Sequence, residues 1–104
     1  MFNKKDKPNN TKKVYSVYDS KAQTYSNPMI SLAKGSMTRD FKTLANDKNH
    51  PIGKYPEDYT LFEIGEWDEF DGFINMYQAK ISLGMAIEYV EQEDKTLPSP
   101  ISSQ

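Results

Sequence analysis

A chain of 104 residues, 37% of them hydrophobic, is long enough to bury one core and too short for a second domain. The absence of Cys excludes disulfides, thiolate metal sites and a Cys nucleophile, and no apolar run is long enough to span a membrane. The net charge of −2 hides an asymmetry, because residues 1–54 carry 11 Lys or Arg and 4 Asp or Glu, whereas residues 55–104 carry 2 and 11.

The two ends of the chain are too polar to form a packed core. Residues 1–12 are rich in Lys and Asn, and residues 93–104 are rich in Ser and Pro. Such segments do not bury enough apolar surface to offset the entropy lost on ordering. We therefore expect a disordered basic arm at 1–12, one domain at 13–92 and a disordered tail at 93–104. The arm either keeps the protein in solution or binds a nucleic acid or an acidic partner.

The first predicted strand covers Val14–Asp19, which is β-branched and aromatic. Alternation places Tyr15 and Val17 on one face, opposite Val14, Ser16 and Tyr18. After a turn at Asn27–Pro28, the short apolar segment Met29–Leu32 forms either an edge strand or a cover over the core.

The clearest helix follows Gly35, with Ser36 as its predicted N-cap and its end near Asn46. One stripe of this helix is apolar and comprises Met37, Phe41, Leu44 and Ala45. The two Pro, the Gly and the Asn within Asp47–Pro56 predict a loop.

A β-hairpin is predicted next, with strands at Tyr59–Trp67 and Phe73–Tyr77 and a turn at Asp68–Gly72. Large apolar groups occupy both faces of its first strand. Strict alternation places Glu63 on the face of Leu61, at a solvated margin. The helix covers one face of the hairpin, and the C-terminal segment or a partner chain covers part of the other.

The remaining apolar residues suit an extended segment at Ile81–Leu83 and a short helix at Met85–Glu91. The fold class is therefore α+β, a small mixed or antiparallel sheet of three to four strands backed by one main helix. A right-handed crossover would make the first hairpin strand parallel to Val14–Asp19. Alternatively, Met29–Leu32 pairs with the first strand as a hairpin and adds a strand to the sheet.

Few residues suggest catalysis or metal binding. His50 is the only His and lies in a Pro-flanked stretch, where we expect it to titrate in solvent rather than bind zinc. The acidic cluster around the hairpin turn resembles a calcium loop faintly, but Phe70 occupies a ligand position, which favours a solvated turn; the cluster is Glu66, Asp68, Glu69 and Asp71. We expect no enzyme activity, no cofactor and no metal.

Binding of nucleic acid has more support in the sequence. The tyrosines Tyr15, Tyr18 and Tyr25 provide rings on which bases stack, and nearby basic side chains provide phosphate contacts. The contacts that we predict are Lys12, Lys13, Lys21, Arg39 and Lys42. The acidic pI of about 5.3 argues against this role, unless the acidic residues lie on another face.

Four segments resemble, in order, the small non-structural protein of gokushovirus-type microviruses, which are single-stranded-DNA phages. These segments are Val14–Ala22 with Tyr25 and Pro28, Arg39–Phe41, Asn46–Asp47 and Tyr55–Asp68. The resemblance implies a phage non-structural protein in the host cytoplasm that acts in single-stranded DNA synthesis or packaging. It supplies no catalytic residues.

Two roles remain open from the sequence. The protein either binds single-stranded DNA or acts as an adaptor that contacts the phage replication initiator, the procapsid or a host factor. Inhibition of a host process is a third alternative. A homodimer is compatible with strands that are apolar on both faces.

Overall fold

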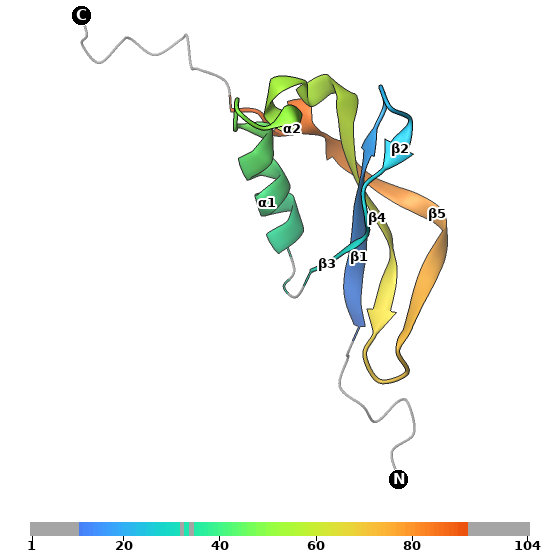
Figure 1. Cartoon of the computed structure of the whole chain (residues 1–104). Helices are drawn as coiled ribbons and strands as arrows, with labels where there is room; N and C mark the ends of the chain where they lie inside the picture. Colours follow the sequence, from blue (N-terminus) through green and yellow to red (C-terminus); the bar gives the residue numbers. More distant parts are fainter. Residues whose placement is uncertain (1–10, 32, 34, 92–104) are drawn as a thin grey trace, which may run out of the picture.

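The computed structural model describes residues 11–31, 33 and 35–91, which form one α+β domain (Figure 1). In chain order the elements are β1 (Thr11–Asp19), β2 (Thr24–Tyr25), β3 (Met29–Ser31), α1 (Ser36–Ala45), α2 (Pro51–Lys54), the 3-10 turn η2 (Pro56–Asp58), β4 (Tyr59–Asp68), β5 (Phe73–Met85) and the 3-10 turn η3 (Ala86–Tyr89). The strands form one five-stranded sheet in the order β2-β1-β4-β5, with β3 also paired to β1. This confirms the predicted fold class.

Every strand pairing is antiparallel, so the parallel crossover between the first and the second long strand is wrong. The alternative hairpin is confirmed, because β3 pairs with β1 and places Ile30 opposite Val14. This return brings the chain back to the N-terminal end of β1, and α1 then carries it to the other end. As a result, β4 starts opposite Asp19 and runs antiparallel to β1.

Strands β2 and β3 occupy the same edge of β1 and are separated by Ser26–Pro28. The Ser26 hydroxyl accepts a hydrogen bond from Val17 N at 2.9 Å, and the Ser16 hydroxyl donates to the Ser26 carbonyl at 2.8 Å. These side-chain bonds satisfy the main chain where Pro28 interrupts the ladder.

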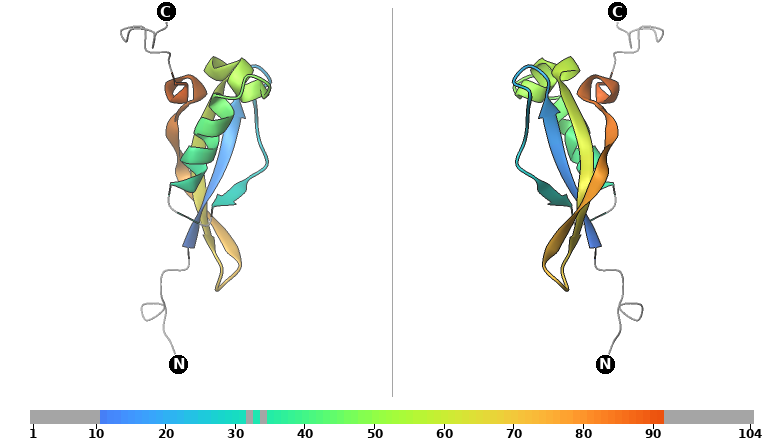
Figure 2. Two further views of the ribbon diagram at one scale, coloured as in Figure 1. Left: turned by 90° about the vertical axis from the view of Figure 1, so that its left-hand side faces the viewer. Right: turned by 90° about the vertical axis from the view of Figure 1, so that its right-hand side faces the viewer.

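Helix α1 covers one face of the sheet (Figure 2). The predicted stripe faces the core, since Phe41 and Ala45 are buried and Met37 and Leu44 pack against them. The N-cap is Gly35, with a φ of 81°, and not Ser36, whose hydroxyl donates to the Ala33 carbonyl at 3.0 Å. A positive φ favours Gly, which explains why the cap falls one residue earlier than predicted.

The core lies between α1 and the sheet. Its buried members are Tyr15, Phe41, Ala45, Ile52, Leu61 and Ala86. The C-terminal turn η3 completes it, because the ring of Tyr89 meets that of Phe41 edge-on, with centroids 5.4 Å apart. The C-terminal segment therefore packs on α1 and does not shelter the other sheet face.

The long hairpin is irregular. Strand β5 extends to Met85, well beyond the predicted Tyr77, and bends midway (Figure 1). Between the pairs Glu63↔Ile81 and Gly65↔Met76, β4 contributes one residue and β5 contributes residues 77–80. Leu61 and Ile64 are both buried, but only Leu61 belongs to the core cluster beneath α1.

The predicted solvated position of Glu63 is wrong, because its side chain is only 15% exposed and lines a cavity together with the core residue Tyr15. Its carboxylate accepts a hydrogen bond from the Tyr77 hydroxyl and lies 3.7 Å from Lys13 Nζ. A partly buried carboxylate needs such partners.

The segment predicted as a loop, Asp47–Pro56, contains α2, and η2 begins at its last residue. His50 caps α2, since its Nδ1 accepts a hydrogen bond from Ile52 N at 3.1 Å. This ring therefore has a structural role that the sequence interpretation missed.

Thr11 and Lys12 belong to β1 and not to the predicted arm. Residues 1–10 and the predicted tail lie outside the described residues. No helix in the described part of the chain is long and apolar enough to cross a membrane.

Candidate nucleic-acid interface

Three aromatic rings and one Lys form a cluster on the sheet face that α1 does not cover. We call Tyr18, Tyr25, Phe62 and Lys80 the aromatic platform. The rings of Tyr18 and Tyr25 are 4.7 Å apart between centroids, and those of Tyr25 and Phe62 are 5.9 Å apart. Lys80 Nζ lies 5.1 Å from the centroid of the Tyr25 ring. The four side chains come from four strands, β1, β2, β4 and β5.

Strand alternation determines which face these rings occupy. Tyr18 follows Val17, and Phe62 follows Leu61, and both of these aliphatic side chains pack into the core beneath α1. Successive side chains of a strand point to opposite faces. The platform therefore lies on the opposite side of the sheet from the helix, and the Tyr25 residue is 46% exposed.

A tight turn brings Tyr25 to this position. The Asp19 carboxylate accepts hydrogen bonds from Lys21 N at 2.9 Å and Ala22 N at 3.2 Å, and Gln23 N donates to the Asp19 carbonyl at 2.7 Å. Gln23 takes a positive φ of 59°, which reverses the chain. Tyr25 thereby becomes the direct cross-strand partner of Tyr18.

This arrangement suits flat, anionic ligands. Tyr25 is exposed, and Tyr18 and Phe62 are half-buried. Accessible aromatic rings stack on nucleic-acid bases, which contributes about 1–3 kcal/mol per base. The Lys80 ammonium over the Tyr25 ring lies where it can reach a phosphate next to a stacked base. The platform therefore combines the two elements that single-stranded nucleic acid requires.

The five basic residues predicted as contacts do not come together. Arg39 and Lys42 are exposed on α1, on the other side of the sheet, and Lys42 Nζ lies 3.3 Å from a carboxylate oxygen of Glu91. Lys21 is exposed in the turn between β1 and β2, close in sequence to two platform rings. Lys12 and Lys13 lie at the far end of β1.

Lys12 and Lys13 are compensated by the acidic half of the chain. Lys12 forms an ion pair with Glu69, and Lys13 Nζ lies 2.7 Å from a carboxylate oxygen of Glu66. The hydrogen bond to Glu66 raises the pKa of Lys13 above its usual value. The charge asymmetry of the sequence is therefore partly cancelled across the β1–β4 ladder.

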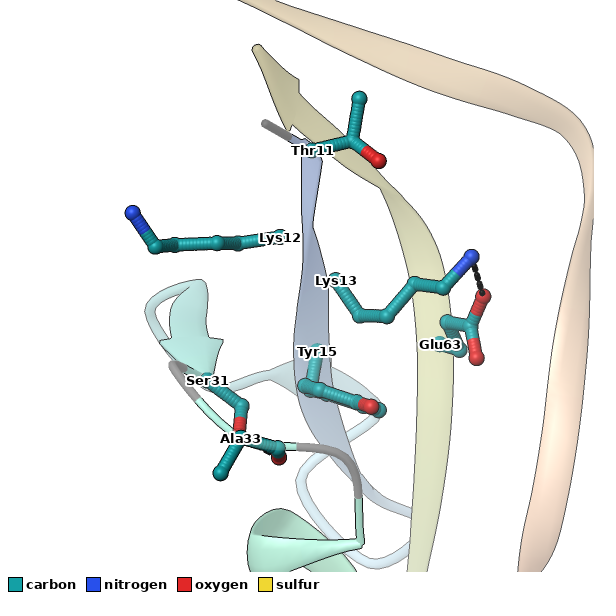
Figure 3. Close-up of a pocket in the computed structure, with 7 residues that line it drawn as sticks. All are labelled: Thr11, Lys12, Lys13, Tyr15, Ser31, Ala33 and Glu63. Carbon is teal, nitrogen blue, oxygen red and sulfur yellow. Dashed lines mark hydrogen bonds and ion pairs between the residues drawn. The ribbon is translucent and has the colours of Figure 1, made fainter. Parts of the chain in front are cut away.

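A small cavity of about 220 Å³ lies beside these lysines (Figure 3). Its lining residues are Thr11, Lys12, Lys13, Tyr15, Ser31, Ala33 and Glu63. Lys13 extends toward Glu63, and Lys12 points away from it.

The Glu63 carboxylate also accepts a hydrogen bond from Tyr77. Burial, followed by this hydrogen bond, raises the pKa of Tyr77, so its phenol keeps the proton that it donates to that carboxylate. The polar groups satisfy one another, which favours a structural role.

A wider groove of about 410 Å³ runs between the β2 edge and α2. Its apolar floor includes Met29 and Ile52, and Tyr25 and Tyr59 line it. Tyr25 therefore borders both this groove and the aromatic platform.

Sequence reasoning placed Tyr15 among the stacking rings, but Tyr15 is only 6% exposed and belongs to the core. It also missed Phe62 and Lys80. Strand alternation places Tyr15 and Tyr18 on opposite faces of β1. Applying it to the stacking rings would have excluded Tyr15 from the predicted set. Lys80 gave no signal, because the bend of β5 that carries it toward Tyr25 is not visible in the pattern.

The acidic turn is exposed at Glu69 and Asp71, as predicted, but Asp68 is only 6% exposed. Its carboxylate accepts hydrogen bonds from Phe70 N at 2.9 Å and Asp71 N at 3.4 Å, and Gly72 takes a φ of 75°. Within residues 11–31, 33 and 35–91, no three His, Asp or Glu side chains are grouped as a metal site requires.

Comparison with known proteins identifies the family. The family model for the Phage ORF5 protein matches residues 12–89, which include the whole aromatic platform and every described strand and helix except Thr11, the first residue of β1. The chain belongs to the Phage ORF5 protein family. Searches of the curated proteins and of the solved structures found no match. The Phage ORF5 assignment makes the chain a bacteriophage protein, and it names no reaction or ligand.

Proposed function

We propose that this Phage ORF5 protein binds single-stranded DNA through the aromatic platform and, without catalysis, acts in synthesis or packaging of the phage genome. The observation that carries the proposal is the set of three contacting rings with a Lys ammonium over one of them, on the sheet face opposite α1. The resemblance to the gokushovirus non-structural protein, whose phages package single-stranded DNA, supports the same ligand. Lys21 is the predicted contact that lies nearest in sequence to the platform.

The overall acidity of the chain is compatible with this role. Glu63, Glu66 and Glu69 form ion pairs with Lys12 or Lys13, away from the platform. Pairing reduces the repulsion that these carboxylates exert on a phosphate, and salt screens what is left over distances beyond about 10 Å. Stacking, which does not require a basic protein, then adds to the affinity that the phosphate contacts of Lys80 and Lys21 supply.

Fluorescence anisotropy with a labelled oligonucleotide tests the proposal. The full chain should bind single-stranded DNA at low salt and lose affinity as salt rises, because Lys80 and Lys21 displace counterions. Tyr25→Ala should weaken binding about tenfold through loss of one stacked base. Tyr55→Ala is the matched control, since Tyr55 is 58% exposed and lies outside the platform.

A second pair of variants separates the two faces of the molecule. Lys80→Ala should weaken binding and reduce its salt dependence, whereas Arg39→Ala on α1 should change neither. Absence of any anisotropy change at low salt would overturn the proposal and leave the adaptor role. A loss confined to Arg39→Ala would move the DNA site to the helix.

A further inference from the structure

The outer edge of β5 forms an unprotected surface on the molecule. Strand β5 is the last strand of the sheet, and no other described strand pairs with its outer side. The hairpin that it forms with β4 projects beyond α1 (Figures 1 and 2). In this projecting part Phe73, Ile74 and Met76 are 65%, 42% and 59% exposed.

Such an edge promotes association. It presents unpaired main-chain N–H and C=O groups, and proteins that remain monomeric usually protect an edge strand with Pro, with Lys, with a bulge or by covering it. Residues 73–76 pair regularly with β4 and precede the extra residues 77–80, and they contain no Pro and no charged residue. The exposed stretch carries apolar side chains on both faces of the strand. Side chains of a strand paired with this edge would therefore pack beside them on each face and bury part of their apolar surface.

We propose that the edge of β5 pairs with β5 of a second copy of this chain, antiparallel and around a two-fold axis near Asn75 and Met76. The charges favour this partner. The uncharged stretch is preceded by Asp71 and followed by Lys80. Antiparallel pairing of two copies brings the acidic end of each stretch toward the basic end of the other, and no like charges oppose each other along the interface.

The geometry of the pairing is isologous, so each surface is its own complement and the assembly closes at two copies. Main-chain hydrogen bonds supply the pairing, and Phe73, Ile74 and Met76 supply the apolar burial. A two-fold axis perpendicular to the sheet keeps equivalent faces on the same side. The sheet of one copy then continues into the sheet of the other.

Mass measurement of the full chain by light scattering after size-exclusion chromatography tests the proposal. The expected mass is twice 12.0 kDa at high concentration and falls on dilution. Ile74→Lys should produce a monomer, because a Lys on an edge strand opposes pairing. Ile87→Lys should remain a dimer, since Ile87 has the same 42% exposure but lies in η3, away from the edge. A monomer at every concentration would overturn the proposal, as would an Ile74→Lys variant that is as dimeric as the parent.

Disulfide trapping locates the axis. The chain has no Cys, so one introduced Cys gives an unambiguous report. Of Asn75→Cys and Met76→Cys, the variant whose residue stands at the axis should form a covalent dimer on mild oxidation, because it then faces its own copy with Cα atoms about 4.5–5.5 Å apart. Ile87→Cys is the control. Crosslinking of both edge variants no faster than the control would contradict the pairing, even if the chain forms dimers.

Discussion

Gly53 lies in α2, where an added Cβ atom would be 1.9 Å from the carbonyl oxygen of Asp47 and 2.9 Å from that of Leu44. Both neighbours are main-chain atoms, so neither can move without shifting the end of α1. We expect Gly53→Ala to lower the free energy of unfolding by about 1–3 kcal/mol or more, measured by urea denaturation. Lys54→Ala, at the exposed next position, should change it little, and equal stability of both variants would show that α2 moves freely.

One side chain at the end of α1 provides two hydrogen bonds to the main chain of η3 and the residues after it. The Asn46 amide nitrogen donates to the Tyr89 carbonyl at 3.1 Å, and its amide oxygen accepts from Glu91 N at 2.8 Å. Because Asn46→Ala leaves these main-chain groups without their partner, we expect a loss of about 1–3 kcal/mol and faster amide exchange at 86–91. The control is Asn49→Ala, in the exposed turn nearby. Unchanged exchange in the Asn46 variant would mean that η3 is held by apolar contacts alone.

The molecule as a whole should lose stability in alkali. Burial raises the pKa of Tyr15, Tyr59 and Tyr77 above the ordinary 10.0, and the hydrogen bond to Glu66 raises that of Lys13. These groups hold their protons more tightly when folded, so their contribution is complete below their unfolded pKa values and declines as pH rises through the folded ones.

Urea denaturation at about pH 8 and about pH 11 measures the alkaline effect. The free energy of unfolding should be lower at the higher pH. Tyr77→Phe should reduce that difference, because the variant has no phenol to ionise beside Glu63. Stability that is equal at the two values, or greater at the higher one, would contradict this assignment of the protons.

The sequence allowed a prediction of the elements that depend on local pattern. The α1 stripe and the β4–β5 hairpin follow from residue periodicity, and the stripe from Met37 to Ala45 faces the core as expected. The direction of β4 relative to β1 did not follow, because it depends on β3, which has three residues and carries little signal. The extra residues between Tyr77 and Lys80 were also missed, since nothing in an alternating pattern marks where a strand bends.

The candidate site was predicted less well than the fold. Tyr18 and Tyr25 were identified from their type, but their partner Phe62 lies in another strand, and the bend of β5 brings Lys80 to Tyr25. Opposite charges in the two halves of the chain suggested a dipole. The antiparallel register converts part of this charge separation into ion pairs, since Lys13 faces Glu66 and Lys12 forms an ion pair with Glu69. A linear charge count does not contain that register.

The antiparallel order of β1, β4 and β5 also determines how the domain responds to force. Thr11 starts β1 beside the hairpin turn, whereas Met85 ends β5 at the opposite end of the sheet, opposite Thr60. Tension applied at these two points acts along the strands and loads the ladder bonds on both sides of β4 together, in shear. Pulling the domain at Thr11 and Met85 therefore does not break the ladder bonds one at a time. Extension requires β4 to slide against both β1 and β5.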